Sequence, residues 1–102
     1  MKKVTVIEFI ESLGVKLPPL EEFWKLGDMT ALWTNETNQF VKLNYYRGPL
    51  LYALVAKHRP KTVLEFGRAK GYATLCMARA MDDFNIDGTI YTLDTKIGRA
   101  HV

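Results

Sequence analysis

The sequence predicts an α/β fold in which N-terminal helices are followed by the first strand–helix–strand unit of a parallel sheet. Residues 62–66 and 89–93 are short apolar runs with the composition of buried strands. Between them lie a loop with two glycines, Gly67 and Gly71, and a helical stretch over residues 72–81. Strands joined by a helical crossover pair in parallel, so these runs should lie side by side.

The N-terminal region should be helical. Thr5 and Glu8 have the spacing of a capping box, and apolar residues then repeat on one helical face until Gly14. A second helix carrying Phe23 and Trp24 is expected over residues 20–26. We expect Trp24 and Trp33 to pack in a core or between subunits, and a substrate lid is the alternative. We expect Gly27 and Asp28 to form a turn.

Two further helices are expected before the first strand. Thr37 or Asn38 can cap a helix that contains Phe40. Pro49 suits the first position of the next helix, and Arg59 should end that helix because a residue before proline avoids helical torsion angles. The apolar stripe of this helix consists of Leu50, Leu51, Leu54 and Val55.

The strand–helix–strand unit itself should be well buried. Residues 62–66 are almost continuously apolar, as in a parallel strand that is covered on both faces. The following helix is apolar around most of its circumference, so Cys76 should be a packing residue. Asp87 and Gly88 form a turn before the second strand.

The bulk composition excludes several classes of protein. The chain has 102 residues and a formal charge of +3. Its basic residues are scattered and form no cluster of the kind that binds nucleic acid. It has no apolar run that could span a bilayer, so no membrane partner is expected. Its single cysteine fits a reducing compartment, and we expect a cytoplasmic protein. Asp82 and Asp83 follow a helix without visible partners, so we assign no metal ligand there.

Two acids mark the ends of the two strands. Glu65 lies at the carboxyl end of the first strand and Asp94 directly follows the second. Open α/β sheets bind their ligands at this edge, where the helix after the glycine loop begins. Carboxylates prefer hydroxyl and ammonium groups to phosphate, so the expected ligand is rich in the former.

These residues resemble a known family. The pattern Glu65-x-Gly67-x-x-x-Gly71, with Asp94 closing the next strand, is similar to the cofactor site of the Rossmann-like (class I) S-adenosylmethionine-dependent methyltransferases. The stretches TVLEFG (62–67) and GYAT (71–74) are most similar to its small-molecule O-methyltransferases. The family often has a third glycine where this chain has Ala69.

The resemblance implies a role for each matched residue. Glu65 would lie near the ammonium of S-adenosylmethionine, and Asp94 would hold its ribose hydroxyls. Gly67 and Gly71 would line its methionine and ribose. Tyr46, before the helix that precedes the first strand, is a further candidate pocket residue.

The resemblance also implies an activity: methyl transfer from S-adenosylmethionine to an oxygen of a small-molecule acceptor, in a parent protein that can form a homodimer. The general base or divalent metal for that step would follow Asp94, so we assign no catalytic residue. We expect residues 1–102 to be a truncated, inactive fragment. It would bind the cofactor poorly and associate through the open edge of its first strand.

Other interpretations remain. A nicotinamide dinucleotide site needs G-x-G-x-x-G, and the spacing of Gly67 and Gly71 does not provide it. Glu65 and Asp94 can also be ordinary solvated acids beside a turn. A different class of function is a non-catalytic module that uses the same fold to sense the cofactor or to assemble.

We divide the chain into an N-terminal helical region (1–60), the start of a cofactor-binding domain (61–95) and a tail (96–102). The last six residues, IGRAHV, are what the nucleotides ATCGGAAGAGCACACGTC of a common sequencing adapter encode. We therefore expect residues 96–102 to be an adapter-derived tail and leave them out of the fold prediction.

Overall fold

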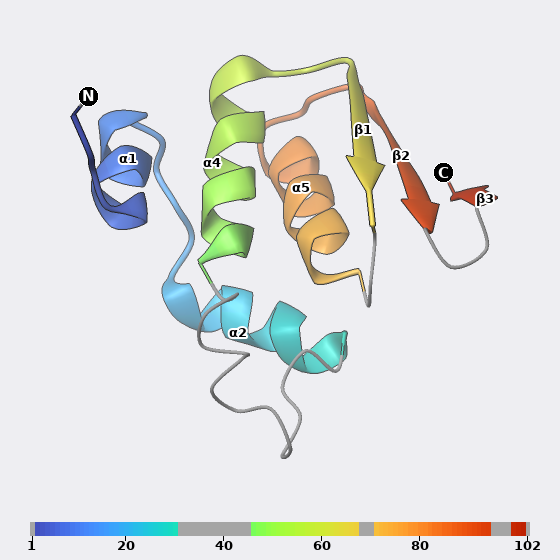
Figure 1. Ribbon diagram of the computed structural model, residues 1–102, viewed down its shortest axis with the longest axis horizontal. Helices are drawn as coiled ribbons and strands as arrows, with labels where there is room; N and C mark the ends of the chain where they lie inside the picture. Colours follow the sequence, from blue (N-terminus) through green and yellow to red (C-terminus); the bar gives the residue numbers. More distant parts are fainter. Residues whose placement is uncertain (1, 31–45, 68–70, 95–98, 102) are drawn as a thin grey trace.

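A computed structural model describes residues 2–30, 46–67, 71–94 and 99–101, which form helices packed beside a small sheet (Figure 1). The helix expected around Phe40, and Trp33, lie outside these residues. The described elements are α1 (Val6–Ser12), α2 (Leu20–Met29), α4 (Arg47–His58), β1 (Thr62–Phe66), α5 (Tyr72–Asp83), β2 (Thr89–Asp94) and β3 (Arg99–His101).

The sheet contains the expected parallel pair. β1 and β2 are parallel, with Thr62 opposite Thr89 and Phe66 opposite Leu93. The α/β class and the order of these elements are therefore confirmed. β3, which the sequence did not predict because it lies in the stretch left out as a tail, pairs antiparallel with β2.

The predicted capping box is present at the start of α1. The Glu8 amide donates to the Thr5 hydroxyl at 3.1 Å, and the Thr5 amide donates to the Glu8 carboxylate at 3.2 Å. This capping box satisfies two amides at the start of α1. Gly14, with φ of 68°, lies just beyond the end of the helix, as predicted.

The turn predicted at Gly27 and Asp28 is wrong, because both residues lie inside α2. Gly27 is buried there, so packing keeps the chain helical past a residue that favours turns. The helix ends instead at Thr30, whose hydroxyl donates to the carbonyl oxygen of Leu26 at 2.9 Å. A side chain that bonds back to the last turn competes with continuation of the helix.

α4 begins two residues earlier than predicted, at Arg47, and ends at His58. Arg59 stops the helix in a left-handed conformation, with φ of 48°. Of the predicted apolar stripe, Val55 is buried but the three leucines are only half-buried, because α4 lies between α1 and α5 (Figure 1) and presents other side chains to them. The buried residues of α4 are Gly48, Pro49, Tyr52, Ala53, Val55 and Ala56.

The core lies where α2, α4 and α5 meet. Phe23 is 1% exposed and packs edge-to-face on Tyr52, with ring centroids 5.5 Å apart. Trp24 is 57% exposed, so Phe23 and not Trp24 is the core residue of α2. Cys76 is fully buried, as predicted, and this burial raises the pKa of its thiol to about 12. The central cluster comprises Phe23, Tyr52, Val55, Tyr72, Cys76, Met77, Ala80 and Met81.

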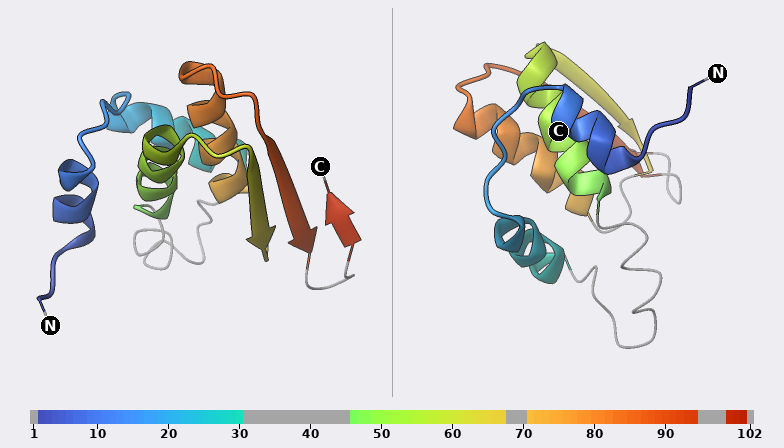
Figure 2. Two further views of the ribbon diagram at one scale, coloured as in Figure 1. Left: turned by 90° about the horizontal axis from the view of Figure 1, so that it is seen from above. Right: turned by 90° about the vertical axis from the view of Figure 1, so that its left-hand side faces the viewer.

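Only one face of the sheet is covered by the described helices. Glu65 is buried, whereas Leu64 and Phe66, which alternate with it along β1, are 58% and 71% exposed. Figure 2 shows the helices gathered on one side of the strands. The prediction that residues 62–66 are covered on both faces is therefore wrong for this structure.

The end of the molecule opposite the strand arrowheads is held by Arg59. Its guanidinium donates to the carbonyl oxygens of Phe84, at 2.9 Å, and Asn85, at 3.3 Å. These bonds join the turn after α4 to the turn after α5.

Of the helices within the described ranges, the longest have 12 residues, and none is long and apolar enough to cross a membrane.

Candidate functional site at the carboxyl ends of the strands

The parallel pairing brings the predicted site residues to one edge of the sheet. The arrowheads of β1 and β2 point to the same end of the molecule in Figure 1, where α5 begins. Glu65 lies opposite Thr92 in the register, and Asp94 comes two residues after Thr92 along β2. The carboxyl ends of both strands and the first turn of α5 therefore share one edge, which is where such sheets bind ligands.

The two glycines adopt the backbone conformations for which glycine is needed. Gly67 has φ of 78° and Gly71 has φ of 91°, both in the left-handed region. A Cβ atom at either position would meet no atom of the described residues within 4 Å, so among these residues the torsion angle and not crowding favours glycine. The Gly67 amide also donates to the Leu93 carbonyl at 2.9 Å, which ties the loop to β2.

Glu65 is the central polar side chain of this edge. It is only 9% exposed and accepts a hydrogen bond from the Thr74 hydroxyl, in the first turn of α5. Burial of a carboxylate is costly unless it is hydrogen-bonded, so Thr74 lowers the cost of keeping Glu65 at the strand end. The interpretation of Glu65 as an ordinary solvated acid is therefore wrong.

The first turn of α5 lies at this edge, so the backbone amides that begin the helix do too. Gly71 is the N-cap residue and makes no side-chain capping bond, and the first turn contains no acid. The first amides of a helix carry partial positive charge. They favour a carboxylate or another anionic group of a ligand at this place.

Asp94 and Tyr46 lie at the periphery. Asp94 is the last residue of β2, and its backbone pairs with Arg99 of β3. Tyr46 is the N-cap residue of α4 and packs, half-buried, against the central cluster. Since α4 runs antiparallel to β1, this turn lies at the same end of the molecule as the strand arrowheads (Figure 1). Its confirmed role is packing, and its role in a pocket stays a prediction.

The sequence did not reveal two residues of the site, Thr74 and Thr92. Thr92 is 4% exposed and lies beside Glu65 on the helix-facing side of the sheet. Alternation along β2 could have placed Thr92 on this face, because a polar residue at an inward position is unusual. The bond from Thr74 to Glu65 joins a helix to a strand, so no local pattern predicts it.

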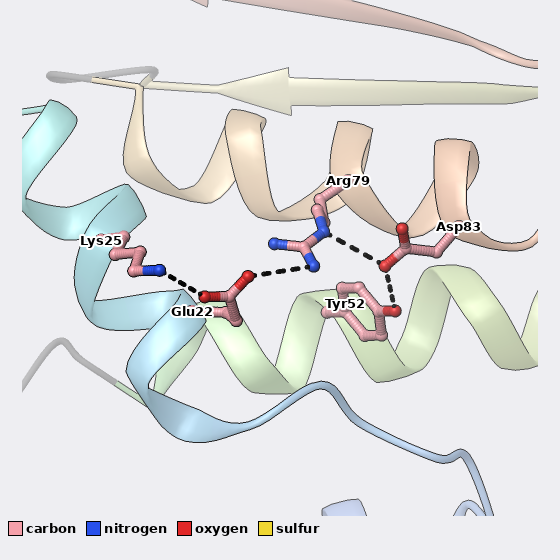
Figure 3. A network of polar contacts seen from close by, with 5 residues as sticks. All are labelled: Glu22, Lys25, Tyr52, Arg79 and Asp83. Atoms are coloured by element: carbon pink, nitrogen blue, oxygen red, sulfur yellow. Dashed lines mark hydrogen bonds and ion pairs between the residues drawn. The ribbon is translucent and has the colours of Figure 1, made fainter.

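A second polar group lies away from this edge, between α2, α4 and α5 (Figure 3). Asp83 accepts a hydrogen bond from the Tyr52 hydroxyl at 2.7 Å and pairs with Arg79 at 3.2 Å, so it is not without partners as the sequence suggested. Arg79 also lies 3.6 Å from Glu22, which pairs with Lys25. The pKa of the Tyr52 hydroxyl is raised, mainly by burial and secondly by its hydrogen bond to Asp83. The pKa of Glu22 is lowered, mainly by its bond with Lys25. This group ties helices together.

Away from this edge the structure has a shallow hollow but no group of metal ligands among the described residues. A shallow surface hollow lined by residues 81–82 and 85–87 lies at the end of α5 remote from Gly71. Across the described ranges, no three His, Cys, Asp or Glu side chains are grouped so that they could hold a metal ion.

No protein-family model, curated protein or solved structure matches this chain. Interpretation of the site therefore depends on its own geometry and chemistry.

Proposed function

We propose that this chain carries the cofactor-binding part of an S-adenosylmethionine-dependent methyltransferase that acts on an oxygen of a small molecule. The observation that carries the proposal is the buried Glu65 carboxylate, which lies at a strand end beside a loop with two left-handed glycines. A buried acid at that place favours a ligand with a positive group and disfavours a diphosphate.

The polar groups of this edge match the chemistry of the cofactor. In the proposal, Glu65 holds its ammonium group, the first amides of α5 attract its carboxylate, and Asp94 accepts bonds from its ribose hydroxyls. No described residue crowds Gly67 or Gly71, which supports an approach of the cofactor to their backbone. Methyl transfer is a displacement at a carbon on a sulfonium, so the protein's main task is to align cofactor and acceptor.

The acceptor, and the base or divalent metal that would deprotonate it, are outside this proposal for residues 1–102. In the family that the sequence resembles, those groups follow the strand that Asp94 closes. We propose that this chain alone binds the cofactor weakly, with a dissociation constant of about 1 mM, or about −4 kcal/mol, and catalyses no transfer.

Titration of the isotope-labelled chain, followed by amide NMR shifts, tests this function. S-adenosylmethionine should shift the signals of Gly67 and Gly71, whereas a nicotinamide dinucleotide should not. Glu65→Gln should weaken binding about tenfold, the value of a hydrogen bond to a charged group. Glu21→Gln, an exposed acid of α2, is the matched control and should bind as the wild type does. Shifts with the dinucleotide alone would refute the proposal.

A second function has one observation in its favour. Leu64 and Phe66 expose apolar side chains on the uncovered face of the sheet, and such surfaces mark sites of association. A non-catalytic assembly or sensing module would use this face. Absence of any cofactor-dependent shift, together with a stable complex in sedimentation, would favour the module over the enzyme.

A further inference from the structure

Three polar side chains gather beneath the first turn of α5. Glu65 of β1 and Thr92 of β2 are opposite one another in the parallel register, so their side chains project from the same face of the sheet. Both are buried, with exposed fractions of 9% and 4%. Thr74 reaches this place from α5 and donates its hydroxyl hydrogen to Oε1 of Glu65.

The bond from Thr74 holds one oxygen of the buried carboxylate, Oε1. An ionised carboxylate only accepts hydrogen bonds and has about four acceptor positions on its two oxygens. Thr74 occupies one of them from the helix side. Because Glu65 is bonded to a residue of the first turn of α5, its carboxylate is held next to the start of that helix.

Thr92 is the unusual member of the group. Its Oγ1 is buried and has no hydrogen-bond partner among the residues that the structure describes. Buried hydroxyls are nearly always paired, and an unpaired one costs about 1–3 kcal/mol. Valine has almost the same shape and would avoid this cost. Thr92 lies opposite Glu65 in the register, so a rotation of the carboxylate that keeps Oε1 bonded to Thr74 could bring Oε2 to this hydroxyl.

We infer that Thr74 and Thr92 are positioning residues for Glu65, an inference that rests on the proposed function. In the cofactor-bound protein both hydroxyls donate to the Glu65 carboxylate, Thr74 to Oε1 and Thr92 to Oε2. The remaining acceptor positions face the ammonium group of the cofactor. In the free protein the Thr92 hydroxyl is unpaired and destabilises the fold. In the bound protein it donates to Oε2 of Glu65.

Two valine variants of the 102-residue chain test this inference with two ligands. S-adenosylmethionine carries the ammonium group, and 5′-methylthioadenosine lacks it together with the carboxylate. Thr74→Val and Thr92→Val should each weaken binding of S-adenosylmethionine about tenfold. Binding of 5′-methylthioadenosine should change less than about twofold. Thr74→Ser and Thr92→Ser keep the hydroxyl and should restore binding of S-adenosylmethionine.

Stability separates positioning from a structural role. Thr92→Val removes an unpaired buried hydroxyl, so its urea midpoint should rise although its affinity for S-adenosylmethionine falls. If the variant is more stable than the wild type, unfolding cannot explain its loss of affinity. Thr74→Val leaves a buried carboxylate without its donor, so its midpoint should fall. If Thr74→Val does not fold, the inference is tested with Thr92→Val and the two serine variants.

Two results would overturn the inference in distinguishable ways. Wild-type affinity for S-adenosylmethionine in both valine variants, or equal loss for both ligands, refutes the positioning role and leaves the proposed function intact. A wild-type chain that does not bind S-adenosylmethionine at all, and shows no shifts at Gly67 or Gly71, refutes the proposed function and the positioning role with it.

Discussion

Gly48, in the first turn of α4, lies where α4 approaches α5 closely. A Cβ atom there would lie 2.3 Å from the Tyr72 hydroxyl oxygen and 2.8 Å from Sγ of Cys76. Both neighbours are buried, with Tyr72 5% and Cys76 0% exposed, so neither can swing into solvent. We therefore expect Gly48→Ala to force α4 and α5 apart.

The size of the effect follows from two opposing contributions. Alanine in place of glycine favours a helix by up to about 1 kcal/mol, while overpacking a core costs about 1–3 kcal/mol. Because two buried groups would be overlapped by more than about 0.5 Å relative to ordinary contact, we take the upper end of the cost. The expected net loss is about 2 kcal/mol, or a fall in Tm of about 8–16 °C for a chain of this size.

Urea and thermal unfolding, followed by circular dichroism, measure this loss. A double variant with Tyr72→Leu, which removes the hydroxyl and ring, is the matched control. Gly48→Ala should cost at least about 1 kcal/mol less in that background, as expected for residues in direct contact. A Gly48→Ala chain that is as stable as the wild type, or more stable, would refute the reasoning.

Two further predictions concern the uncovered sheet face and the buried thiol. Phe66→Lys, on a side chain that is 71% exposed, should reduce self-association in sedimentation velocity and change the free energy of unfolding by less than about 0.5 kcal/mol; unchanged association would exclude this face. Burial raises the pKa of Cys76 from 9.0 to about 12, so the stability that this thiol contributes is complete below pH 9.0 and is lost as the pH rises toward 12. Cys76→Ala should flatten this part of a stability–pH profile, and an unaltered profile would show that the thiol does not contribute to it.

Elements that depend on local chemistry were predictable from the sequence. The capping box of α1 needs only the spacing of Thr5 and Glu8, and the parallel pairing of β1 and β2 follows from a helix between two apolar runs. The position of Glu65 at the end of a strand was also predictable from the local sequence. These features depend on neighbours along the chain or on a single crossover.

What the sequence did not predict depends on contacts between distant segments. Gly27 continues α2 because it is buried, although glycine favours turns in isolation. The leucines of α4 are not its most buried residues, since the orientation of α4 is set by both α1 and α5. The link from Thr74 to Glu65 joins positions nine residues apart on different elements. Spacing alone cannot reveal such contacts.

The bonds of Arg59 have a consequence for how the molecule opens. They close the end of the α4–β1–α5–β2 unit that is remote from the site. At the other end, Gly67 is held by its bond to Leu93, and left-handed glycines interrupt the chain before α5. Local unfolding starts where few contacts oppose it. The Arg59 bonds should therefore keep the turns after α4 and α5 together, and amide exchange should be faster at Gly71, before the first turn of α5, than at Val55 in the buried middle of α4.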